Sequence, residues 1–103
     1  MLLLNIDHIP GTEFEVLGLV DGSVVMCKDV GSDFAASFRS FVGGEIPEYT
    51  QMLSEARRTA LDRMVKAAQT LHADAVINIR YSTSEAMQNA AEVIAYGTAV
   101  KFI

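Results

Sequence analysis

One long run of helical periodicity constrains the fold of this chain more than any other feature. Between Gly43 and His72, apolar and small side chains recur at steps of three and four residues, which places them on one stripe of an α-helix. Pro47 suits the first helical turn, where its missing N–H needs no partner. The stripe consists of Tyr49, Met52, Leu53, Ala56, Ala60, Leu61, Met64, Ala67, Ala68 and Leu71. The sequence therefore predicts one helix over 43–72, lying on a sheet that covers the stripe.

The opposite side of this helix is polar, and Asp62 precedes Lys66 in the favourable i,i+4 order. This side is predicted to face solvent. His72 stands where a left-handed cap residue is expected, a conformation that histidine tolerates better than most other residues that carry a Cβ. We therefore interpret His72 as the helix cap rather than as a metal ligand.

Composition limits the classes of function. A chain of 103 residues that is 50% hydrophobic can form one core without disulfides, so residues 1–103 are predicted to be a single domain. A net charge of −5 argues against nucleic-acid and anionic-membrane partners. The single cysteine, Cys27, favours a cytoplasmic protein. Met1–Leu4 is too short for a signal peptide or a membrane span and is predicted to be an edge strand.

The segment from Phe14 to Lys28 is rich in β-branched and aromatic residues and allows two interpretations. Asp21-Gly22 is a hairpin signal, which would divide the segment into two strands. Alternatively, Gly18 and Gly22 are bulge positions in one long bent strand. Local pattern alone leaves both alternatives open.

Further elements follow on each side of the long helix. Phe34, Phe38 and Phe41 share a helical face and predict a short helix before it. After it, residues 75–82 alternate as a half-buried strand, with Ala75, Ile77, Ile79 and Tyr81 on one face. The segment Ser84–Ala91 is predicted to be a loop.

The last strand, predicted over Glu92–Ile103, is apolar on both faces and needs cover on both. One helix covers one face only. We assign the large row to the helix and the small row to a neighbouring subunit, which predicts a closed oligomer. The large row is Ile94, Tyr96, Val100 and Phe102, and the small row is Val93, Ala95, Gly97 and Ala99.

Several short motifs together resemble one known family. They are Val42-Gly43-Gly44-Glu45, Glu48-Tyr49-Thr50, Glu55-Ala56-Arg57, Ala60-Leu61-Asp62-Arg63-Met64, Ala73-Asp74-Ala75-Val76, Thr83-Ser84-Glu85 and Ala95-Tyr96-Gly97-Thr98-Ala99-Val100. Over nearly its whole length the chain is similar to the YbjQ-like family, described as "putative heavy-metal-binding" proteins. Three positions depart from the family pattern: Cys27 replaces a small residue, and His72 and Asn89 replace glycines.

The resemblance implies an α+β fold in which one long helix packs on a curved, mainly antiparallel sheet. Its core order is β-α-β-β with short extra elements, as in a dodecin subunit. The resemblance also favours the long bent strand over the hairpin, and it implies a cyclic homo-oligomer of five subunits. It supplies no ligand set that can be carried over, and Cys27 cannot stand for a family metal thiolate.

Three residues are candidate ligands for a divalent metal ion: Glu45, Glu48 and His8. Glu45 follows two glycines at the helix start, where its charge and that of Glu48 would repel phosphate and suit a cation. Oxygen ligands suit hard ions, whereas a heavy metal prefers thiolate or imidazole. The alternatives are that Glu45 caps the helix or pairs with an arginine, and that His8 is an exposed loop residue whose neighbour Asp7 points to the opposite face.

The remaining inventory does not favour catalysis. The two histidines belong to no recognisable catalytic pattern, and no phosphate loop, metalloprotease motif or cysteine pair is present in the sequence. Cys27 is interpreted as a buried residue, and Met52 and Met64 as core filling. The sequence therefore predicts a non-catalytic ring-forming protein that binds a metal or small ligand at subunit interfaces. A purely structural or adaptor oligomer ranks second, and an enzyme with active sites between subunits ranks third.

Overall fold

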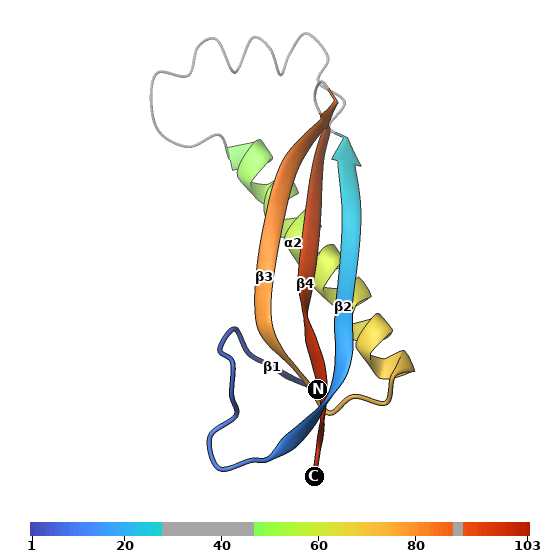
Figure 1. Ribbon diagram of the computed structural model, residues 1–103. Coiled ribbons are helices and arrows are strands. Elements are labelled where there is room, and N and C mark those ends of the chain that lie inside the picture. The colour runs from blue at the N-terminus through green and yellow to red at the C-terminus, as the bar shows by residue number, and fades with distance from the viewer. Residues whose placement is uncertain (28–46, 88–89) are drawn as a thin grey trace, which may run out of the picture.

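The computed structural model describes residues 1–27, 47–87 and 90–103. One long helix, α2 (Pro47–Thr70), packs on a four-stranded mixed sheet (Figure 1). The strands are β1 (Leu2–Leu3), β2 (Phe14–Cys27), β3 (Ala75–Met87) and β4 (Ala90–Phe102), in the spatial order β1-β3-β4-β2. Only the β1–β3 pair is parallel. The α+β class and the β-α-β-β core are therefore confirmed, with β1 as the expected edge strand.

The helix ends as the sequence predicts. His72 has a φ of 60°, and its N–H donates to the Gln69 carbonyl at 2.9 Å, while the N–H of Ala73 donates to the Ala68 carbonyl at 3.1 Å. These two bonds are the paired contacts of a Schellman motif, which satisfies the last carbonyls of a helix. The cap role of His72 is confirmed. The predicted helix start at 43–46 and the predicted short helix around Phe38 lie outside the described residues.

The segment after Phe14 is one strand and not a hairpin. Its register with β4 shifts once, between Val16 and Gly18, and Gly18 has a φ of 141°. Gly18 is therefore the bulge, because only glycine adopts that conformation without strain. The second predicted bulge, at Gly22, is wrong: Gly22 pairs in register with Ala95.

The pair β3–β4 is longer than the sequence predicts, and the predicted loop over Ser84–Ala91 is wrong for most of its length. Pairing continues through Ser84 with Glu92 and Glu85 with Ala91. Polar residues are compatible with a strand here because the side chains at 81–85 are exposed. Main-chain pairing with β4, rather than burial of side chains, therefore accounts for the length of this strand.

The alternation predicted for residues 75–82 is interrupted within that range. The register shifts between Ile77 and Arg80, and Asn78 lies in the left-handed region with a φ of 55°. Residues that pair directly across an antiparallel ladder share a face. Tyr81 pairs with Ala95 on the helix side, whereas Ile77 pairs with Thr98 on the other side. The four residues predicted to share one face are therefore divided between two.

The assignment of the two rows of β4 is reversed in the structure. The small row faces α2: Val93, Ala95 and Ala99 are fully buried in one cluster with the helix. The helix side of this cluster is also small, apart from Met64. It consists of Ala56, Ala60, Met64 and Ala68. Small residues permit close approach, and the element that approaches is the subunit's own helix.

A second, smaller cluster lies on the other face of the sheet, at its lower end in Figure 1. The N-terminal segment crosses there, and Ile9 packs with Ala75, Ile77 and Val100. Leu4 and Phe14 flank this cluster. This segment covers only that end of the sheet. Within the described ranges, no helix is long and apolar enough to cross a membrane.

Candidate functional site

The face of the sheet turned away from α2 is the main candidate for an interaction surface, and we call it the open face. Figure 1 views the molecule from this side, with α2 behind the strands. Cross-strand pairing places alternate residues of three strands on it. They are Leu19, Asp21, Ser23 and Val25 of β2, Glu92, Ile94 and Tyr96 of β4, and Arg80, Ser82 and Ser84 of β3.

Large apolar side chains on the open face remain in solvent. Leu19 is 75% exposed, Val25 is 54% exposed and Tyr96 is 38% exposed. Ile94 is half-buried, and it pairs with Ser23 on one side and Ser82 on the other. Among the described residues, only the N-terminal segment covers this face, and it stops at the lower end. Exposed apolar side chains on one uncovered sheet face, with polar residues between and around them, favour a protein–protein contact there.

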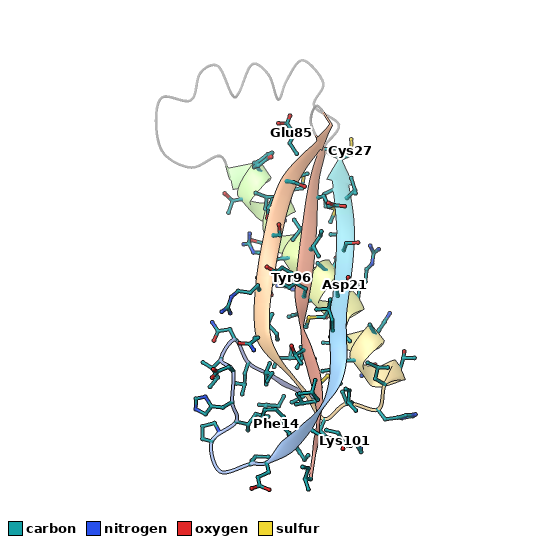
Figure 2. The ribbon with its side chains drawn as sticks, in the orientation of Figure 1. Phe14, Asp21, Cys27, Glu85, Tyr96 and Lys101 are labelled. Carbon is teal, nitrogen blue, oxygen red and sulfur yellow. The ribbon has the colours of Figure 1, made fainter. Side chains whose placement is uncertain are left out.

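Charged residues of opposite sign flank the aromatic residue at the centre of the open face. Asp21 pairs with Tyr96 across β2 and β4, and Arg80 pairs with Tyr96 across β3 and β4. Figure 2 labels Asp21 and Tyr96 side by side near mid-sheet. The guanidinium of Arg80 donates to the main-chain carbonyl of Asn5 at 3.1 Å, which ties the N-terminal segment to β3. A partner on this face must accommodate both charges.

The three predicted metal ligands are not brought together by the described part of the chain. Glu45 lies outside it, and Glu48 belongs to the first turn of α2, with a side chain that is also outside the description. His8 lies in the N-terminal segment, 67% exposed at its side chain. Its interpretation as an exposed loop residue is confirmed.

The expectation that Asp7 and His8 point to opposite faces is wrong. His8 Nδ1 and Asp7 Oδ1 are 3.0 Å apart. The segment bends here rather than continuing as a strand, so neighbouring side chains can meet. The hydrogen bond from His8 lowers the pKa of the Asp7 carboxyl below its ordinary value, with smaller contributions in the same direction from a backbone hydrogen bond and the imidazole charge.

Within residues 1–27, 47–87 and 90–103, no group of three or more His, Cys, Asp or Glu side chains could hold a metal ion. The Asp7–His8 pair offers two donors, fewer than the four that a closed tetrahedral site uses. The described residues of one subunit therefore do not fit a heavy-metal centre. Additional ligands would have to come from another subunit or from residues outside the described ranges.

Cys27 is exposed, so its interpretation as a buried residue is wrong. It is the last residue of β2 and pairs with Ala90 of β4, on the open-face side of the strand. Figure 2 shows Cys27 at the upper end of the sheet. A strand residue is buried only where another layer covers its face, and α2 lies on the opposite face.

Sequence reasoning predicted that one face of β4 stays uncovered by the helix, but it assigned the wrong row to that face and did not include β2 in it. The signal was present in β2, where Leu19 and Val25 alternate with the residues that face α2. Asp21 and Ser23 lie between these two residues on the same side of β2, and they made this side resemble the solvent-facing side of an ordinary strand. The row becomes an apolar surface only when β4 supplies Ile94 and Tyr96 beside it.

Comparison with known proteins identifies the family. A family model described as "Putative heavy-metal-binding", YbjQ, matches residues 1–103. A UPF0145 protein of Clostridium novyi is 54% identical over 103 residues, covering 100% of both chains. A UPF0145 protein of Thermotoga maritima is 54% identical over 102 residues, covering 98% of this chain and 96% of its own length.

One similar solved structure supports the fold alone. It is a protein of unknown function of the DUF74 family from Pediococcus pentosaceus, with a TM-score of 0.67 and 17% sequence identity. The match covers 100% of this chain and 98% of that one. The fold and the whole-length family match lead to the same conclusion: this chain is a member of the YbjQ family, whose members are described as "Putative heavy-metal-binding".

Proposed function

We propose that this protein is a non-catalytic homo-oligomer whose subunits meet across the open face, and that a divalent metal ion or small ligand binds where subunits meet. The observation that carries the proposal is the exposure of Leu19, Val25 and Tyr96 on one continuous sheet face. Fully burying an exposed valine or leucine side chain contributes about 1.5–3 kcal/mol, and these partly exposed residues would each gain part of that. A second copy of the same chain is the simplest partner for this face, because it is present wherever the protein is made.

The arrangement we favour is a closed ring of five subunits in the cytoplasm. A ring gives every subunit the same contacts, so no copy leaves its open face in solvent. The family resemblance supports the number five, and the single cysteine supports the compartment. Nucleic acids and anionic membranes do not fit as partners, because the net charge of −5 opposes both.

The metal part of the proposal rests on the family description and on the small donor set near the N-terminus. Asp7 and His8 supply one carboxylate and one imidazole at 3.0 Å from each other. A shared site requires donors from a second subunit, for which Glu45 and Glu48 are the candidates. Imidazole nitrogen favours zinc, copper or nickel over the hard ions that carboxylates alone select.

Native mass spectrometry of protein purified without a tag or chelator tests both parts together, because it reports subunit number and retained ligand. Titration with zinc, copper and nickel should then saturate at an integer number per subunit or per ring. His8→Ala, Glu45→Ala and Glu48→Ala should weaken binding, whereas Gln69→Ala on the exposed side of α2 should not. Weak metal binding whose affinity is unchanged by all three substitutions would rule out the metal role.

A purely structural or adaptor oligomer is the second candidate. The same open face favours it, since apolar contact alone accounts for assembly without any ligand. It predicts the same subunit number in native mass spectrometry but no retained metal and no saturable titration. The two candidates therefore differ in one measurement.

A further inference from the structure

The outer edge of β2 presents a hazard for assembly. In the described sheet β2 is the last strand, and it is 14 residues long. Val16, Leu19 and Val25 are exposed along it. A long apolar edge strand offers unpaired main-chain groups to strands of other copies, and such addition has no natural end. A protein that forms closed assemblies must prevent that addition.

A side chain of α2 is already hydrogen-bonded to the main chain of this strand. The Arg63 guanidinium donates through Nη1 to the main-chain carbonyl of Ser23 at 2.6 Å, across 40 positions of sequence. Gly22, the preceding residue, brings the helix close enough for this contact, because a Cβ there would collide with the backbone of Ala60 and Met64. The bond joins a permanent positive charge to the middle of the strand.

We propose that Arg63 guards the β2 edge against open-ended strand addition by other copies of this chain. A strand arriving at Ser23 would have to displace the charge-assisted hydrogen bond from Arg63 before it could pair with that carbonyl. Two further features act in the same direction: the bulge at Gly18 interrupts the regular edge, and Asp21 places a charge beside it. With the edge closed, the open face remains the surface for assembly, so the inference deepens and rests on the proposed function.

The test compares Arg63→Ala with Arg58→Ala, an exposed arginine on the solvent side of the same helix. Both are made in a Cys27→Ser background, which removes disulfide cross-linking. Thioflavin T fluorescence and sedimentation velocity follow aggregation. Arg63→Ala should form thioflavin-positive, open-ended aggregates with a lag several-fold shorter than that of Arg58→Ala. Arg63→Lys, which keeps a charged donor, should restore the lag.

Loss of stability must be separated from loss of the guard. Val93→Ala, which shortens a fully buried side chain, serves as a destabilised control whose Tm is measured beside that of Arg63→Ala. If Arg63→Ala does not fold, Arg63→Gln replaces it. The proposal is overturned if the Arg63 variant aggregates no faster than Arg58→Ala, or no faster than Val93→Ala at equal Tm. A soluble wild-type monomer together with fast aggregation of Arg63→Ala would instead remove the proposed oligomer and leave the guard standing.

Discussion

Gly22 of β2 lies directly beneath the main-chain carbonyl of Ala60 in α2, and no Cβ fits between them. Small residues surround this close contact on both sides: Ala56 and Ala60 on the helix, and Ala95 on β4. The short distance between α2 and the sheet is therefore possible because the residues at the contact are glycine and alanine. The only described helix packs on this face of the sheet. It therefore leaves the other face of the same strands, the open face, without a helix.

Replacing Gly22 with alanine should destabilise the subunit strongly. The added methyl group meets the backbone of Ala60 and Met64, which cannot move aside as a flexible side chain could. Overpacking of this kind typically costs about 1–3 kcal/mol, and backbone collision places Gly22→Ala at the upper end. Urea unfolding followed by circular dichroism measures the loss. Ser23→Ala, at the exposed neighbouring position, should change stability by roughly 0.5 kcal/mol or less; equal effects would contradict the close contact.

A glutamate at Ala95 should unfold the subunit rather than dissociate the assembly. Ala95 is fully buried against α2, so a carboxylate there would be desolvated without a partner. We expect loss of the cooperative thermal transition in Ala95→Glu, measured by circular dichroism. Retention of a native spectrum with a lower mass would show that this row faces a neighbouring subunit after all.

The elements that follow from local pattern were predictable from the sequence. The α2 stripe between Ala56 and Ala68 and the cap at His72 depend on neighbours within a few residues, and the structure confirms both. The bulge at Gly18 was one of two alternatives that local pattern left open, and the family resemblance favoured it. The end of β3 was not predictable in this way. Polar residues at 82–85 pair with β4 because a partner strand is available, which no local pattern reports.

The two rows of β4 show why face assignment fails from one strand alone. Large residues were assigned to the helix, and small residues were assigned to a neighbouring subunit because they allow close approach. The structure places Ala95 and Ala99 there because α2 brings its own alanines to the contact, and close approach of two backbones excludes bulk. The candidate metal ligands share this limitation. Whether His8 lies close to Glu45 or Glu48 depends on the tertiary and subunit arrangement, which the local pattern around each residue does not report.

The Asp7 carboxyl should titrate below the ordinary value for aspartate, and His8→Gln should move its pKa upward. A carboxyl whose pKa is lowered by folding stabilises the native state above the unfolded pKa, and this contribution is lost as pH falls through the lowered value. Because Asp7 is fully exposed, the change in stability should be small. Two-dimensional NMR titration of the carboxyl carbon measures the pKa directly; an unchanged value in His8→Gln would contradict the role of the imidazole.

Cys27 should react readily with a thiol reagent in a folded subunit that is diluted below the concentration at which it assembles. Its exposure at the end of β2 leaves the sulfur accessible, and the reaction should need no unfolding. Ellman's reagent, used with and without urea, compares the two states. We expect similar rates in both, with Cys27→Ser leaving metal binding intact. Protection in the native oligomer that disappears on dilution would place Cys27 at a subunit contact.

Assembly through the open face is the central claim, and the native mass tests it most directly. Multi-angle light scattering after size exclusion, at micromolar subunit concentration, should give a closed oligomer with five subunits as the expected number. Tyr96→Glu and Leu19→Glu should lower that mass while keeping the helical circular dichroism, because both side chains are exposed within the subunit. Lys66→Glu, on the solvent side of α2, should leave the mass unchanged. A wild-type monomer of 11.2 kDa would contradict the claim outright.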